Sequence, residues 1–259
     1  MGRYFFLGSI LPPIKLGNNL EISFEDLVEL FRENLKSSDW EKVSKIRRYI
    51  DLKNVRSLLA KEPLDVRGNL TEKELDEALV NQEGLTKDLY EYLESYETLE
   101  EQLSHFSWVF MTFFKDMEKK EKGFLKFYFN FEREWRLILA GYRSKKLGVD
   151  PSRELQHEDF TDPLVAQIIA QKEAAFFEFP FGYEDLNEKI KGVEGNPMQQ
   201  YQLMAGFQLE RIADTTQDRP FSSDFILGYL VQHMIVEDWQ ALDSVKGNES
   251  LTEIVKGSL

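Results

Sequence analysis

Apolar residues recur at helical spacing along most of the chain, and this period constrains the fold more than any other feature. From Phe24 onward, apolar positions three and four residues apart alternate with charged ones, which is typical of amphipathic helices. Helix-start signals precede several of these stretches, namely Ser23 with Asp26, Ser38 with Glu41, Thr71 with Glu74, Asp162 with Pro163, and Ser222. Strand signals are scarce, and no Asn-Gly or Asp-Gly hairpin turn is present. We therefore predict an all-α, multi-helix bundle in which more than about half of the residues are helical.

The pattern also predicts where individual segments begin and end. One long amphipathic helix is expected over residues 86–119, and another is expected to run from Pro163 toward Phe177. The apolar segment over residues 4–11 contains Gly8 and is stopped by two prolines, so we expect an extended N-terminus lying on the body. It has neither a clear basic region nor a cleavage site, which argues against a signal peptide.

Charge and residue usage exclude several classes of protein. The 259 residues carry a net charge of −14, which argues against nucleic acid as the main partner. The absence of cysteine rules out disulfides and thiolate metal sites. No apolar run approaches the roughly 20 residues that would span a bilayer. We expect a cytoplasmic protein that reaches the inner membrane only through protein contacts within a complex.

No known catalytic pattern is present. Glu154 and His157 have the Glu-x-x-His spacing of di-iron bundles, but a second such pair is missing. His233 is four residues from Glu237, and we expect these two to form a surface contact. Phosphate loops, dinucleotide fingerprints and nucleophile elbows are absent. We expect no cofactor, no bound metal and no enzymatic activity.

Two helical segments align without gaps at an offset of 80 residues. Arginine, leucine and alanine coincide when residues 54–60 are placed on residues 134–140, and a fainter relative follows at residues 238–242. Chance remains an alternative, because amphipathic helices share apolar spacing. The alignment predicts one helical module over residues 1–259, with related helices near 51–60, 131–148 and 224–242.

A basic strip is the candidate protein-binding site. It comprises Arg133, Arg136, Arg143, Lys145 and Lys146, and Arg56 occupies the position of Arg136 in the other copy. Cations near a helix C-terminus also favour the helix dipole, which is a sufficient alternative explanation for the last three members of the strip.

Three segments together resemble a known family. The stretch Tyr128-Phe129-Asn130-Phe131-Glu132-Arg133-Glu134-Trp135-Arg136 continues through an apolar run to Arg143-Ser144-Lys145-Lys146-Leu147-Gly148. It resembles the signature of the C (or d) central-stalk subunit of rotary V/A-type ATPases, and residues 51–59 and 229–242 resemble further copies of it. The opening residues 4–13 are similar to those of a bacterial family of unknown function that accompanies V-type ATPase subunits.

The resemblance implies a fold and a role. It implies three related helical bundles in a funnel-like arrangement and a non-catalytic subunit that couples the rotor shaft to the membrane ring. The expected partners are therefore the rotor shaft subunits and the membrane ring of an ATP-driven or ATP-synthesising ion pump. Two alternatives stay open: an unrelated helical scaffold or regulatory protein, and an enzyme whose carboxylate site has no recognisable pattern.

Overall fold

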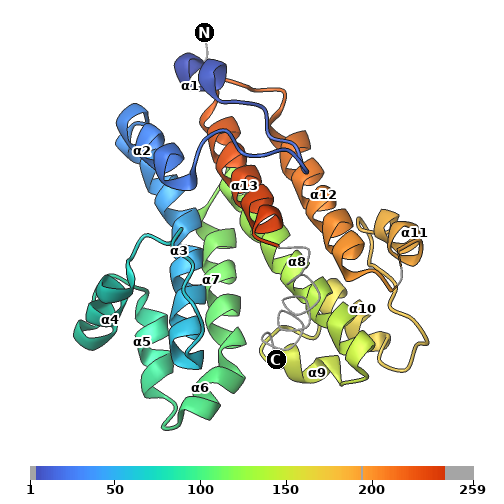
Figure 1. The fold of residues 1–259 in the computed structure, drawn as a ribbon. Coiled ribbons are helices and arrows are strands. Elements are labelled where there is room, and N and C mark those ends of the chain that lie inside the picture. The colour runs from blue at the N-terminus through green and yellow to red at the C-terminus, as the bar shows by residue number, and fades with distance from the viewer. Residues whose placement is uncertain (1–3, 194, 243–259) are drawn as a thin grey trace. The chain divides into compact units, whose positions relative to one another are not determined.

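The protein is all-helical. The computed structural model describes residues 4–193 and 195–242, and 68% of these lie in thirteen α-helices with no strand among them (Figure 1). The predicted fold class is therefore confirmed. No helix of the described residues is long and apolar enough to cross a membrane.

The chain divides into two compact units. Unit 1 comprises Met1–Asn34 and Asn130–Leu259, and unit 2 comprises Leu35–Phe129. Unit 2 contains α3 (Ser37–Ala60), α4 (Glu72–Asn81), α5 (Lys87–Glu94), α6 (Leu99–His105), α7 (Ser107–Lys120) and the first turns of α8 (Gly123–Leu147). Unit 1 contains α1 (Phe5–Ile10), α2 (Phe24–Asn34), the rest of α8, α9 (Pro151–Glu154), α10 (Pro163–Ala170), α11 (Asp185–Lys191), α12 (Pro197–Thr216) and α13 (Ser223–Gln240). The expectation of a single module stays a prediction.

Aromatic rings fill the core of unit 2. Tyr49 of α3 packs against Phe110, Phe113 and Phe114 of α7, with ring centroids 5.1–5.9 Å apart. The phenylalanines between positions 106 and 114 therefore lie in the core. Edge and offset contacts of this kind add about 0.5–1.5 kcal/mol each beyond the burial of apolar area.

Buried polar residues of α3 hold the connection that follows it. Asn54 is 2% exposed, accepts a hydrogen bond from the Asp65 amide and donates one to the Asp65 carbonyl, both at 2.8 Å. Asp51 accepts from the Leu70 amide at 3.1 Å and from Asn69 at 2.8 Å. Burial outweighs these bonds and raises the pKa of Asp51.

Unit 1 has its own aromatic core, to which α8, α12 and the segment just before α11 contribute. Trp135 stacks on Phe207 at 5.7 Å and on Tyr183 at 6.2 Å, and Phe131 stacks on Trp135 at 6.1 Å. The Tyr183 hydroxyl donates to Glu134 at 2.8 Å. Two long helices, α12 and α13, pack along each other in the same unit (Figure 1).

Several expected helix ends are confirmed. Ser23 accepts from the Asp26 amide at the start of α2, and Thr71 with Glu74 forms a complete capping box at the start of α4. Asp162 caps α10 with a proline as its next residue, and Ser222 caps α13. Gly148 has a φ of +66° just past α8, a conformation that glycine adopts without strain.

Other expected boundaries are wrong, and most have a local cause. The long helix over residues 86–119 is three helices. Thr98 forms a capping box with Glu101 and starts α6 afresh, and a second break at Phe106 separates α6 from α7. The helix that begins at Pro163 ends at Ala170 rather than near Phe177. Ser38 does not open its helix; α3 begins at Ser37 and lacks a side-chain cap. No predicted helix corresponds to α11.

The N-terminal segment lies on the body as expected, but its residues Phe5–Ile10 form a short helix rather than extended chain. Leu7 is 1% exposed while Phe5 and Phe6 face outward, so one helical face is buried. The Tyr4 amide donates to the Phe221 carbonyl at 3.1 Å, and Tyr229 donates to the Pro12 carbonyl at 2.9 Å. Gly8 permits the close packing, because a Cβ there would lie 2.3 Å from the Pro220 carbonyl oxygen.

The order of helix lengths repeats along the chain. A helix of 24 residues, α3, is followed by three short helices and then by the 14 residues of α7. A helix of 25 residues, α8, is likewise followed by three short helices and then by the 20 residues of α12. Arg56 of α3 and Arg136 of α8 therefore occupy the same place in this order. Whether the two sets superpose stays a prediction.

Candidate functional site

Two members of the basic strip are engaged inside unit 1. Arg133 donates to Glu158 at 2.8 Å and to Asp162 at 2.9 Å, and Arg136 donates to the other oxygen of Glu158 at 2.7 Å. Glu158 has a side chain only 3% exposed and lies in the segment between α9 and α10. Burial opposes the charge of Arg133, but Glu158 and Asp162 outweigh it and raise the pKa of this guanidinium. These two arginines therefore anchor the segment after α9 onto α8.

The two lysines of the strip also have partners within the chain. Lys145 donates to the carbonyl oxygens of Gln171 and Lys172, at 3.2 and 2.9 Å, just past the end of α10. Lys146 donates to Gln200 of α12 at 2.6 Å and lies over the ring of Tyr142 at 4.8 Å. Both lysines therefore tie neighbouring segments to the last turn of α8, where the dipole also favours a cation.

Arg143 differs from its neighbours. Its side chain is partly buried on α8, yet its guanidinium makes no hydrogen bond or ion pair within the described part of the chain. Burial lowers the pKa of this arginine, and the more distant Glu154 carboxylate only partly opposes that effect. Arg56, by contrast, lies 3.5 Å from Glu62 in unit 2, and that carboxylate is 43% exposed.

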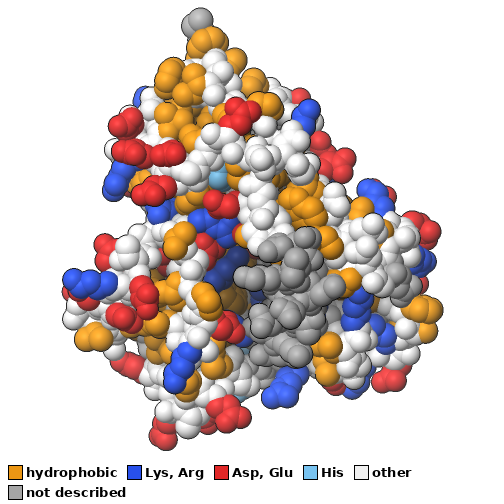
Figure 2. All heavy atoms as spheres, in the orientation of Figure 1, with side chains coloured by type: hydrophobic (Ala, Val, Ile, Leu, Met, Phe, Trp, Pro, Cys, Tyr) orange, Lys and Arg blue, Asp and Glu red, His pale blue; other side chains and the backbone are white. Residues whose placement is uncertain are grey.

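An apolar surface on α1 is the second candidate site. Phe5, Phe6 and Ile10 are 52%, 56% and 46% exposed, although α1 itself is fixed to α13 and to the loop before it. Figure 2 shows apolar side chains gathered over α1 at the top of the view. Exposed aromatic clusters on rigid elements favour protein contacts. The phenylalanines were visible in the sequence, but only the basic strip was predicted as a binding site.

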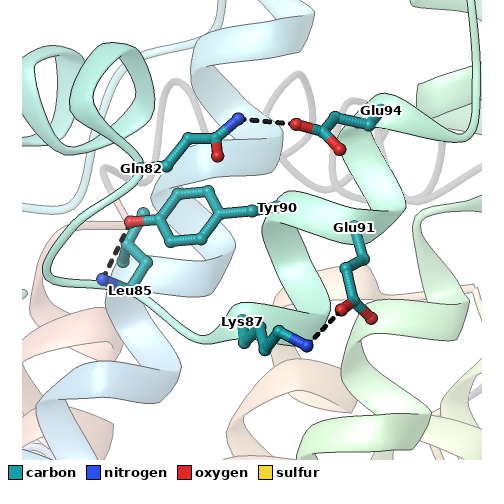
Figure 3. Close-up of a pocket in the computed structure, with 6 residues that line it drawn as sticks. All are labelled: Gln82, Leu85, Lys87, Tyr90, Glu91 and Glu94. Carbon is teal, nitrogen blue, oxygen red and sulfur yellow. Dashed lines mark hydrogen bonds and ion pairs between the residues drawn. The ribbon is translucent and has the colours of Figure 1, made fainter.

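Residues 71–101 of unit 2 form a strongly acidic segment. Residues 71–101 contain eleven carboxylates and two lysines, a net charge of −9 out of −14 for the whole chain. A shallow open hollow of about 390 Å³ lies within this region, lined by Gln82, Leu85, Lys87, Tyr90, Glu91 and Glu94 (Figure 3). In it, Glu91 pairs with Lys87 at 2.7 Å and Glu94 accepts from Gln82 at 2.7 Å. This surface is complementary to a basic partner.

The histidines provide no ligand cluster. No group of three or more His, Cys, Asp or Glu residues that could hold a metal is found in residues 4–193 and 195–242. The predicted surface contact of His233 is wrong: this residue is fully buried, and its Nε2 lies 2.8 Å from the Ile22 carbonyl oxygen. Because a carbonyl only accepts, Nε2 carries the proton. His233 therefore fastens α13 to the segment before α2.

These features describe an all-α protein with separate apolar and acidic surfaces. The chain belongs to the family described as "Protein of unknown function (DUF2764)", whose pattern matches residues 1–257.

Similar proteins come from Chlamydia. A protein of Chlamydia trachomatis, described as "Uncharacterized protein", is 26% identical over 265 residues, and the match covers 99% of each chain. A Chlamydia muridarum protein with the same description is 25% identical over 263 residues, again covering 99% of each chain. No solved structure shows a significant match.

Proposed function

We propose that this protein is a non-catalytic subunit of a rotary V/A-type ATPase that couples the rotor shaft to the membrane ring. The observation that carries the proposal is the repeated order of helices, in register with the segments that resemble the central-stalk subunit. Residues 51–59 lie in α3 and residues 128–147 lie in α8, and each of these helices opens one set of a long helix, three short helices and a further helix. The third resembling segment begins in α13.

Stiffness within each unit supports a coupling role. A part that transmits torque must resist bending, and closely packed aromatic rings with satisfied buried polar groups give low compressibility. Unit 2 has the ring cluster around Tyr49, and unit 1 has the stack around Trp135. The Arg133–Glu158 and Asn54–Asp65 contacts additionally fix the segments that follow the two long helices.

A coupling subunit also needs two different contact surfaces. The apolar surface of α1 suits a partner that offers an apolar groove, and the acidic surface of residues 71–101 suits basic segments. One surface belongs to unit 1 and the other to unit 2, so the protein has chemically distinct faces for the shaft and for the ring.

Co-purification tests the proposal directly. The tagged protein is co-expressed with the shaft and ring subunits of the V-type ATPase from the same organism, and the subunits retained on the tag are identified. We expect at least one rotor subunit to be retained, and its retention to weaken with added salt if the acidic surface takes part. If no rotor subunit is retained even at low salt, the protein is instead a helical scaffold or regulator.

A pair of phenylalanine variants tests the α1 surface. Phe6→Ser removes an exposed ring from α1, whereas Phe181→Ser removes a ring that is 91% exposed elsewhere in unit 1. We expect the first to weaken retention and the second to leave it unchanged, because only the α1 ring lies in the proposed contact. Equal retention by both variants would exclude α1 as a contact surface.

A further inference from the structure

Among residues 4–193 and 195–242, the guanidinium of Arg143 has no contacting partner, whereas Arg136, Lys145 and Lys146 each have one. Arg136 is ion-paired, Lys145 binds two carbonyls and Lys146 binds Gln200, each at 3.2 Å or less. Arg143 has none of these contacts in the described residues and is nevertheless only partly exposed. A desolvated guanidinium that lacks a hydrogen-bonding acceptor is unfavourable for the free protein.

The surroundings of Arg143 indicate what would compensate this charge. Glu154 of α9 acts on it only at a distance, so its planar group of donors stays available. Leu147, one helical turn further along the same face of α8, is 42% exposed and supplies an apolar neighbour. An arginine beside exposed apolar area has the composition of an interface anchor.

We propose that Arg143 receives a carboxylate of a partner subunit, an inference that rests on the function proposed above and names the chemistry of one of its contacts. A single arginine matches a carboxylate in two parallel hydrogen bonds. A phosphate site would need further cations, and those nearest in sequence, Lys145 and Lys146, are already bound within the chain. Glu154, whose charge acts on Arg143 from a distance, would also repel a more highly charged anion more strongly.

Stability measurements on the isolated protein form the first part of the test. Arg143→Met keeps the length of the side chain and removes the charge. We expect its thermal midpoint to equal or exceed that of the unmodified protein, because no hydrogen bond or ion pair among the described residues is lost and a desolvated charge is removed. Arg136→Met, which breaks the pair with Glu158, should lower the midpoint. If Arg143→Met also lowers it, Arg143 is structural and the inference fails.

Affinity for the co-purifying rotor subunit forms the second part. We expect Arg143→Met to weaken binding at least about tenfold, as loss of an anchoring arginine does. Arg153→Met provides the matched control, since Arg153 is an exposed arginine of α9 in the same unit, and it should bind as the unmodified protein does. Normal rotor binding by Arg143→Met overturns the inference and leaves the proposed function standing.

Two further outcomes separate the remaining explanations. If the unmodified protein binds no rotor subunit, the proposed function and the inference fall together. Inorganic phosphate titrated into the isolated protein tests the competing ligand. Saturable binding that Arg143→Met abolishes would assign the site to phosphate and overturn the carboxylate. Restored binding when Arg143→Glu meets a partner carrying an acidic-to-lysine change would identify the carboxylate itself.

Discussion

Glu158 is the acceptor on which the packing of the segment after α9 depends, so its removal should destabilise unit 1. Its two oxygens accept from Arg133 at 2.8 and 3.3 Å and from Arg136 at 2.7 Å, and its side chain is 3% exposed. Glu158→Ala deletes all three contacts. Arg133 keeps Asp162 at 2.9 Å, so part of the network survives.

The expected size of the effect follows from the exposure of the two arginines. Removing one partner of a fully buried ion pair costs about 3–5 kcal/mol. The side chains of Arg133 and Arg136 are 23% and 21% exposed, so solvent screens part of this loss. We expect a decrease of about 2–4 kcal/mol in the free energy of unfolding. For a protein of this size that corresponds to a fall of about 5–10 °C in the thermal midpoint.

Urea unfolding followed by circular dichroism measures the change, with Glu188→Ala as the control. Glu188 is 86% exposed and lies 3.4 Å from Lys191, so its loss should alter stability by no more than about 0.5 kcal/mol. Glu158→Gln, which keeps an acceptor but not the charge, should fall between the two. Equal stability of Glu158→Ala and Glu188→Ala would refute the view that this network holds the segment to α8.

Two other predictions follow from local geometry. Gly68→Ala should destabilise unit 2 by about 1–3 kcal/mol in the same urea assay, because the new Cβ would lie 2.5 Å from Asp51 Oδ1. A stability equal to that of the unmodified protein would show that the connection after α3 shifts to accommodate the methyl group without cost. Asp150 should titrate with a pKa of about 2, because Lys172 donates to it at 2.6 Å and the Ser152 amide also donates to it. Since this folded pKa lies below the ordinary 3.8, the stabilising contribution is present above about pH 3.8 and is lost as the pH falls toward 2. Carboxyl NMR should show Lys172→Met raising the Asp150 pKa toward 3.8, and an unchanged value would contradict the pairing.

Sequence reasoning predicted the fold class well, because helical period and capping are local. The capping box at Thr71 depends on residues three apart, and the glycine that ends α8 acts at its own position. The same reasoning failed where a local signal was overlooked, as at Thr98, or where tertiary packing decided the outcome. The residues on either side of α1, Tyr4 and Pro12, are held by Phe221 and Tyr229, which lie more than 200 positions away.

The basic strip shows why the candidate site was harder to predict. Its residues share one helix and one charge, so the sequence treats them alike. The partners of Arg133 and Arg136 lie in a connection 22–29 residues further on, and the partner of Lys146 lies in α12, 54 residues further on. No spacing rule within α8 can reveal which cation those connections will reach.

The same comparison explains why we propose Arg143 as the partner contact in preference to the charged strip as a whole. A cation bound within its own chain can contact another protein only by giving up an existing bond, so much of the interaction free energy cancels. Arg143 has no contacting acceptor to give up in the described residues, and its burial cost is already present in the free protein. A partner carboxylate that binds Arg143 therefore contributes nearly its full interaction free energy to the affinity. We therefore expect Arg143 to contribute most of the binding free energy of the strip. Neutralising Lys145 or Lys146 should instead lower the free energy of unfolding more than it lowers affinity for the partner.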